Sequence, residues 1–171
     1  MTHTTAPTQA WVSDITYLKT QQGWQYLATV MDTHTREIVG WAMDGRMQTA
    51  LIQSALIMAI KKAKPQSDVI VHSDRGSQYM SIGYQNLLKR LNLIPSTSEK
   101  GSCYDNAMME SFYHTLKTEV VYRYPILPKE ELRSLVFRYI EGFYNSQRIH
   151  SALGYLSPKQ FKEKLKNNST L

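Results

Sequence analysis

The chain has 171 residues, 42% of them hydrophobic, which suffices for one domain with its own core. The net charge of +6 and the pI near 9.4 suit a polyanionic partner, although they fit a merely basic soluble protein about equally well. The single cysteine, Cys103, excludes an internal disulfide framework and a multi-cysteine zinc site and favours a reducing cytoplasm, and no run of residues predicts a membrane span or a signal peptide.

The first part of the chain predicts a sheet and a helix. Short runs rich in Val, Ile, Trp, Tyr and Thr predict an antiparallel meander of three strands over residues 10–18, 24–32 and 36–43. Apolar residues then recur at helical spacing over residues 48–63, with Thr49 as the expected N-cap and a proline just after the expected end.

The next segment predicts a strand over residues 67–74, a helix near 81–91 and a strand near 93–96. This order requires a parallel pair of strands with a right-handed crossover, so we expect an α/β fold with a mixed five-stranded sheet flanked by helices. Residues 96–104 are polar and without periodicity, which predicts a mobile loop that contains Cys103 and has no chemical role.

The last third is predicted to be helical. An apolar stripe of Met109, Phe112, Tyr113, Leu116 and Val120 predicts a helix over residues 106–121. Pro128 opens a second helix, whose expected apolar stripe is Leu132, Leu135, Val136, Tyr139, Ile140 and Phe143. Ser157, Pro158 and Gln160 form the capping signature of a short terminal helix. The expected organisation is an extension over residues 1–9, a core over 10–166 and a disordered tail over 167–171.

Three acidic residues stand where burial favours apolar side chains. Asp14 lies inside the first predicted strand, Asp74 just beyond the carboxyl end of the fourth, and Glu110 on the predicted helix. Carboxylates from separate elements provide the hard oxygen ligands that Mg²⁺ requires. Taken singly, each has an ordinary alternative: a solubility residue for Asp14, a turn former before Gly76 for Asp74, and a first-turn acid for Glu110.

The helix that carries Glu110 also has a polar face. Asn106, Glu110, His114 and Lys117 follow one another at spacings of four, four and three residues. An amide, an imidazole and a cation beside the acid suit a metal ligand next to a phosphate-binding track. Arg75 directly follows Asp74, so we expect Arg75 and Lys117 to meet phosphates.

Three strings of residues carry a family resemblance. HSDRGSQY (72–79), DNAMMESF (105–112) and YNSQRIHSALGYLSP (144–158) stand in this order, and 35 residues separate Asp74 from Glu110. With Asp14 in WVSDITYL, the chain resembles over roughly residues 10–165 the catalytic core of bacterial insertion-sequence transposases of the OrfB type. These belong with the retroviral integrases to the DDE, RNase H-like superfamily.

The resemblance implies an RNase H-like fold and a DDE-type polynucleotidyl transferase. Asp14, Asp74 and Glu110 would hold two Mg²⁺ (or Mn²⁺) ions about 3.5–4 Å apart for in-line displacement at phosphorus, with no covalent protein intermediate. Water would cleave the donor strand and the released 3′-hydroxyl would perform strand transfer. The expected partners are transposon ends, target DNA and further copies of the chain, in the bacterial cytoplasm and at the nucleoid.

Several other residues have competing interpretations. Asp105 is predicted to be an N-cap, His72 a structural histidine and Asp32 a turn former, rather than metal ligands. Tyr144, Asn145, Arg148 and His150 fit the YN…R.H pattern of the family, which leaves both a bracing role and DNA contact open, so Arg148 joins Arg75, Asn106, His114 and Lys117 as a candidate DNA-binding residue.

Two other functions compete with a transposase core: a nuclease of the RNase H type that does not join strands, and a non-catalytic DNA-binding or assembly module. The complete acidic triad opposes the second. Relatives of this type normally carry a helix-turn-helix region before the core, whereas about ten residues precede the first predicted strand here. The sequence therefore predicts a fragment or truncated copy and leaves the recognition of transposon ends open.

Overall fold

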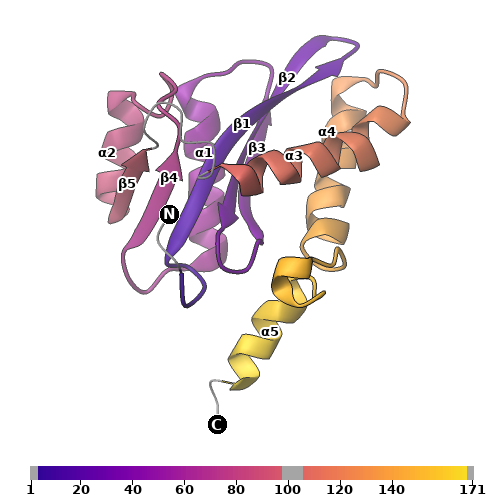
Figure 1. Cartoon of the computed structure of the whole chain (residues 1–171). Helices are drawn as coiled ribbons and strands as arrows, with labels where there is room; N and C mark the ends of the chain where they lie inside the picture. Colours follow the sequence, from indigo (N-terminus) through magenta and orange to yellow (C-terminus); the bar gives the residue numbers. More distant parts are fainter. Residues whose placement is uncertain (1–3, 98–105, 169–171) are drawn as a thin grey trace.

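Five strands form one mixed sheet in the order β3-β2-β1-β4-β5 (Figure 1). The computed structural model describes residues 4–97 and 106–168. The antiparallel meander is confirmed: β1 (Ala10–Thr20) pairs with β2 (Gly23–Asp32), and β2 pairs with β3 (Ile38–Asp44). The parallel half is also confirmed, since β4 (Val69–Ser73) pairs in parallel with both β1 and β5 (Leu93–Thr97).

Helices cover both faces of the sheet. On one face, α1 (Thr49–Ala63) and α2 (Ile82–Arg90) pack against a core that includes Trp11 of β1. On the other, α3 (Ala107–Glu119) and α4 (Lys129–Phe137) pack against a core that includes Val12. Neighbouring residues of β1 therefore serve opposite layers, as the alternation of side chains along a strand requires. No helix in the described residues is long and apolar enough to cross a membrane.

The ends of two helices differ from the prediction. Thr49 is the first residue of α1 and not its cap; Gln48 holds the cap position without a side-chain hydrogen bond. The helix expected over residues 106–121 ends at Glu119, and a short 3-10 turn, η1 (Val121–Arg123), follows. Helix boundaries depend on the contacts of the first and last turn, which local sequence specifies weakly.

A π-helical segment shifts the buried face of the fourth helix by one residue. α4 continues into η2 (Arg138–Tyr144), where the backbone nitrogen of Asn145 donates to the oxygen of Ile140, five residues earlier, over 3.1 Å. The predicted stripe was wrong at Phe143, which is 39% exposed, whereas Tyr144 is 3% exposed. A π turn takes up one extra residue, so the residue that faces the core changes after it. The correctly predicted buried residues are Leu132, Val136, Tyr139 and Ile140.

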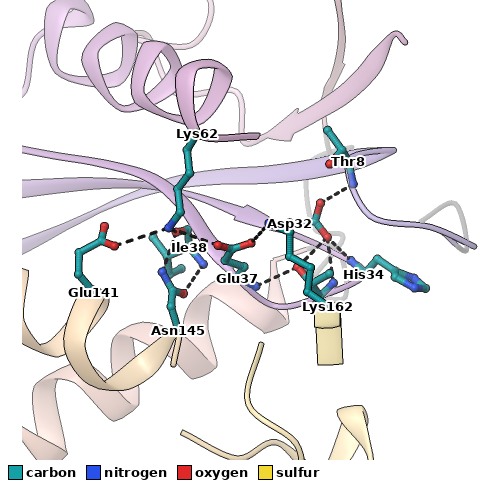
Figure 2. Close-up of polar contacts among 10 residues, drawn as sticks. Thr8, Asp32, His34, Glu37, Ile38, Lys62, Glu141, Asn145 and Lys162 are labelled. Atoms are coloured by element: carbon teal, nitrogen blue, oxygen red, sulfur yellow. Dashed lines mark hydrogen bonds and ion pairs between the residues drawn. The ribbon is translucent and has the colours of Figure 1, made fainter. Parts of the chain in front are cut away.

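The segment after η2 docks on the start of β3 (Figure 2). The side chain of Asn145 is buried; it accepts a hydrogen bond from the backbone nitrogen of Ile38 over 2.8 Å and donates to the oxygen of that residue over 3.0 Å. Beside this pair, Glu37 forms ion pairs with Lys62 of α1 at 3.3 Å and with Lys162 at 2.8 Å. These contacts fix the helical second half of the chain to the edge of the sheet.

The chain ends with a short 3-10 turn, η3 (Ser151–Leu153), and helix α5 (Pro158–Asn168). The predicted capping box is confirmed: Ser157 N donates to Gln160 Oε1 over 2.9 Å, and Gln160 N donates to Ser157 Oγ over 3.3 Å. The helix continues two residues past the predicted end of the core at residue 166.

Candidate active site

The parallel pairing of β1 and β4 brings two of the three acids to matching positions. The register runs from Ala10 opposite Ile70 to Val12 opposite His72. Asp14 and Asp74 each follow two residues later on their own segments. Since parallel strands advance at the same rate and lie about 4.8 Å apart, the register places the two acids side by side where β4 ends.

Helix α3 carries the third acid to the same face of the sheet. Asp14 has the same strand parity as Val12 and Leu18, which belong to the core under α3. Asn106 Nδ2 donates to Asp14 Oδ2 over 3.0 Å, and Tyr113 Oη donates to the backbone oxygen of Asp14 over 2.7 Å. Glu110 lies on α3 between these two anchors and is exposed. The helix is thus attached to Asp14 on both sides of Glu110.

The other two acids affect the pKa of Asp14. Burial is the largest cause that raises the pKa of Asp14, and the charges of Asp74 and Glu110 raise it further. Hydrogen bonds from the side chain of Asn106 and the backbone of Ile15 act in the opposite direction. Asp74 and Glu110 are therefore each close enough to disfavour the charge of Asp14, and a cation beside Asp14 would offset that effect.

The donor set fits Mg²⁺, although the side chains are not gathered around a common centre. Within residues 4–97 and 106–168, no three or more His, Cys, Asp or Glu side chains are grouped closely enough to hold a metal ion. Asp74 Oδ1 accepts a hydrogen bond from Gly76 N over 2.7 Å, which is the contact expected of a turn former at this position. Asp74 and Glu110 are both exposed, so a turn of their side chains toward Asp14 requires no repacking of the core, although Asp74 would have to release its bond to Gly76.

Two neighbouring polar residues have structural partners. His72 Nδ1 lies 3.0 Å from Ser96 Oγ on β5, in line with the predicted structural role. Asp32 is 2% exposed and accepts hydrogen bonds from the backbone nitrogens of Thr8 at 2.6 Å, His34 at 3.0 Å and Thr35 at 2.9 Å, as Figure 2 shows in part. Asp32 is therefore the turn former that the sequence predicted.

The candidate DNA-binding residues differ in their surroundings. Arg75 and His114 are exposed, whereas Lys117 is half-buried with its Nζ 5.4 Å from the centre of the Tyr17 ring. Asn106 is half-buried and bonded to Asp14; its Oδ1 is buried without a hydrogen-bond partner. Asp105 and Cys103 lie outside the described residues, and Asn106 takes the cap position of α3, although its side chain makes no capping hydrogen bond to the helix.

The YN…R.H residues brace α3 from its far end. Arg148 Nη1 contacts both carboxylate oxygens of Glu119, the last residue of α3, at 2.5 and 2.6 Å. Tyr144 is buried with its ring 4.8 Å from that of Phe112 on α3 and 5.1 Å from that of His150. These contacts support the bracing interpretation of the motif.

Sequence reasoning missed two residues of this arrangement. Tyr113 was predicted to belong to the apolar stripe, but its hydroxyl also holds the backbone of Asp14. Glu119 received no role, although it is the partner of Arg148. A tyrosine in place of phenylalanine in the buried stripe was a usable signal, because a buried hydroxyl requires a hydrogen-bond partner.

Comparison with known proteins shows the family of this chain. Residues 4–103 match the family described as "Integrase core domain", and residues 110–165 match a second family with the same description. The chain belongs to the integrase core family. The RNase H-like fold that the resemblance implied is therefore confirmed. The sheet order β3-β2-β1-β4-β5 agrees with that fold.

Curated relatives of this integrase core come from insertion sequences. "Transposase InsF for insertion sequence IS3A" of Escherichia coli is 49% identical over 162 residues, which are 95% of this chain and 56% of the relative. "Insertion element IS600 uncharacterized 31 kDa protein" of Shigella sonnei is 49% identical over 160 residues, covering 94% of this chain and 59% of the relative. The chain thus spans little more than half the length of the curated relatives it matches.

Solved structures share the fold. The HTLV-2 integrase catalytic core domain in complex with magnesium (trimeric form) has a TM-score of 0.72 and 16% identity, over 94% of this chain and 99% of the other. A chain of the simian T-cell lymphotropic virus intasome in complex with PP2A regulatory subunit B56 gamma has a TM-score of 0.75 and 21% identity, over 91% of this chain and 54% of the other.

Proposed function

We propose that the chain is the catalytic core of a DNA transposase of the IS3 type, which cleaves phosphodiester bonds and transfers strands during transposition. The observation that carries the proposal is the arrangement of the three acids. The parallel register brings Asp74 beside Asp14, and two hydrogen bonds tie the helix that carries Glu110 to Asp14. Membership of the integrase core family and the transposase names of relatives that are 49% identical support it. The complete set of acids opposes a purely structural DNA-binding module.

Asp14, Asp74 and Glu110 are the proposed metal ligands and catalytic residues. The HTLV-2 core with the same fold was solved with magnesium, and the three carboxylates supply oxygen ligands of the type that Mg²⁺ or Mn²⁺ binds. Two bound ions would polarise the scissile phosphate and stabilise the charge on the attacking and leaving oxygens. The side chains of Asp74 and Glu110 turn toward Asp14 to complete the site.

Other residues of the chain position the reactants. Asn106 orients the Asp14 carboxylate through its amide, and Tyr113 fixes the Asp14 backbone. Arg75 follows Asp74 directly and Lys117 lies two helical turns beyond Glu110, where both meet phosphates beside the scissile bond. The reaction requires no protein nucleophile: water cleaves the donor strand, and the released 3′-hydroxyl attacks the target strand.

The expected partners follow from this reaction. Transposon ends and target DNA bind the acidic site, and more than one copy of the chain assembles in the active complex so that two ends are joined together. The expected place of action is the nucleoid in the bacterial cytoplasm.

The test has two stages. Nicking of supercoiled plasmid with Mg²⁺ or Mn²⁺ measures cleavage, and joining of oligonucleotides with pre-cleaved 3′ ends to a target plasmid measures strand transfer. Glu110→Gln should abolish both, while Glu130→Gln, also an exposed first-turn glutamate, should abolish neither. Nicking without joining would instead identify a nuclease, and equal activity of the two variants would remove the acidic site from the mechanism.

A further inference from the structure

A groove outside the acidic site lies between the β1–β2 hairpin and the segment that joins α3 to α4. It has a volume of about 450 Å³. Its walls come from the end of β1, the start of β2, the second half of α3 and the connector after it. The residues that give it its character are Tyr17, Lys19, Trp24, Lys117, Tyr122 and Tyr124.

Hydrogen bonds fix the two walls of the groove to each other. Gln21 at the hairpin turn donates from its backbone nitrogen to the oxygen of Leu127 and from its side chain to the oxygen of Ile126, each over 3.0 Å. Lys129 N donates to the side-chain oxygen of Gln22 over 2.8 Å. The two walls are therefore fixed to each other before any ligand arrives, so binding requires little ordering of the protein.

The groove combines exposed aromatic rings with positive charge. Tyr122 is 70% exposed, Tyr17 60%, Tyr124 51% and Trp24 49%. Lys19 and Lys117 also line it, and none of its twelve lining residues is acidic. Exposed rings of this size cost free energy in water unless a partner covers them, and a cationic groove with several aromatic rings matches the physical requirements for single-stranded nucleic acid.

The location links the groove to the acids. Lys117 lines the groove and lies on the α3 face that carries Glu110, seven residues earlier. With a rise of 1.5 Å per residue, the distance along the helix is about 10 Å, the span of two or three nucleotides. The Lys117 Nζ over the Tyr17 ring stands where the acidic face of α3 meets the aromatic wall.

We propose that this groove binds unpaired nucleotides of the DNA strand that leaves the acidic site, with bases stacked on Trp24, Tyr122 and Tyr124 and phosphates held by Lys19 and Lys117. The proposal rests on the proposed function as far as the DNA substrate is concerned. Paired bases are already stacked on one another and cannot cover the rings. The groove should therefore distinguish unpaired from paired DNA and should not distinguish one sequence from another.

Tryptophan fluorescence gives a direct readout of this binding. Trp24 is half-exposed in the groove, whereas Trp11 is fully buried and Trp41 is 6% exposed. Titration with a single-stranded thymidine oligonucleotide in EDTA should quench the emission of Trp24, and a duplex of equal length should quench it much less. Trp24→Phe should lose the quenching, which assigns the signal to this residue and not to Trp11 or Trp41, and anisotropy of a labelled oligonucleotide gives the Kd independently. Equal quenching by single strand and duplex, or none by either, would overturn the proposal.

A matched pair of tyrosine variants locates the site. Tyr122 in the groove and Tyr155 outside it are both 70% exposed. Tyr122→Ala should weaken single-strand binding about tenfold, because loss of one base stack corresponds to roughly 5- to 150-fold in Kd. Tyr155→Ala should leave the Kd unchanged. Equal effects of the two variants would exclude the groove as the binding site.

A third comparison separates this proposal from the catalytic one. Glu110→Gln should abolish cleavage and keep the quenching of Trp24, because the groove lacks that residue. Wild-type cleavage with no quenching would refute the groove alone. A blue shift of Trp24 emission that depends on protein concentration, without any response to oligonucleotide, would show that a second copy of the chain covers the groove and would overturn the proposal.

Discussion

Tyr113 of α3 donates its hydroxyl hydrogen to the backbone oxygen of Asp14 on β1, and 2.7 Å separates the two oxygens. The same hydroxyl lies 2.6 Å from Thr29 Oγ on β2, which donates to it. Burial raises the pKa of Tyr113 well above its ordinary value, so the phenol stays protonated and keeps its donor role. This chain of bonds fixes α3, and with it Glu110, above the strand that carries Asp14.

Removal of this hydroxyl should therefore affect both stability and catalysis. Tyr113→Phe removes the hydrogen bonds of this buried hydroxyl to Thr29 Oγ1 and to the Asp14 carbonyl, which should cost about 1–3 kcal/mol of unfolding free energy. Chemical denaturation measures the loss, and plasmid nicking should fall with it. Tyr155→Phe, at an exposed position, should change stability by less than about 0.5 kcal/mol. An unaltered Tyr113→Phe protein would contradict the proposed tie.

Substitution of the acids should separate activity from folding. Asp14→Asn, Asp74→Asn and Glu110→Gln remove a ligand charge at constant shape, so each should reduce metal-dependent nicking by orders of magnitude. Because burial and two neighbouring charges raise the pKa of Asp14, ionisation of Asp14 costs stability, and Asp14→Asn should raise the melting temperature without metal. Asp68→Asn, at an exposed position before β4, is the control. Normal cleavage by any triad variant would refute its assignment.

Addition of Mg²⁺ should stabilise the folded chain. An ion that binds the folded state alone raises the unfolding free energy by about 2.7 kcal/mol at a hundredfold excess over Kd. Differential scanning fluorimetry should show a higher melting temperature with Mg²⁺, and the shift should disappear in Glu110→Gln. Ca²⁺ should also stabilise the chain but support little cleavage, because it tolerates irregular coordination. A shift of equal size in the variant would place the ion elsewhere.

Two arginines should respond differently to salt. Arg75→Ala should reduce the slope of log K against log salt for DNA binding by about one, since one phosphate contact is lost. Arg148 is engaged with Glu119, so Arg148→Ala should leave the slope unchanged and lower stability by about 0.5–1 kcal/mol. A double-mutant cycle with Glu119→Gln should show that the two residues are coupled. A lower slope for Arg148→Ala would instead restore its role as a DNA contact.

Acid should destabilise the chain through His150. Burial, aided by Arg148 and Arg36, lowers the pKa of His150 to about 4 from an ordinary value of 6.5. Between these two values the unfolded chain takes up a proton that the folded chain does not, so the unfolding free energy falls as the pH drops from 6.5 to 4. With allowance for partial exposure, the loss should be about 1–2 kcal/mol.

The ring contact with Tyr144 suggests the matching variant. His150→Phe keeps an aromatic ring beside Tyr144 and has no group to protonate, so its unfolding free energy should depend less on pH over this range. His114→Asn, at an exposed position, should retain the wild-type dependence. Denaturation curves at several pH values provide the measurement, and identical dependence in wild type and His150→Phe would exclude this histidine as the cause.

Local sequence predicted the sheet and most helices because their signals are periodic. Alternation along the first three strands and the capping box at Ser157 need no knowledge of distant residues. The exchange of Phe143 for Tyr144 at the core could not be predicted in this way, because the π turn ends in the contacts of Asn145 with Ile38, 107 residues away. The π turn is linked to contacts with a distant strand. A stripe of apolar residues at α-helical spacing cannot indicate such contacts.

The candidate site was predictable as a set of acids but not as an arrangement. Nothing near Asp14 in the sequence indicates that Asn106 and Tyr113 hold its carboxylate and its backbone. The aromatic groove was also beyond prediction, since its walls lie about 100 residues apart and each wall alone shows only scattered tyrosines and lysines. Both features arise where the hairpin and α3 meet, which only the fold specifies.

The π-helical turn η2 also gives the chain one residue that it can lose. Because a π turn holds one residue more than an α-helical turn, deletion of Gly142 would let an ordinary α-helix continue from α4 to Tyr144. Tyr144 and Asn145 would keep the side of the helix that faces the core. In an ordinary α-helix, a one-residue deletion rotates every later residue by about 100° around the helix axis. At η2 the extra residue of the π turn absorbs that rotation, so the chain should tolerate there a deletion that would disrupt its other helices.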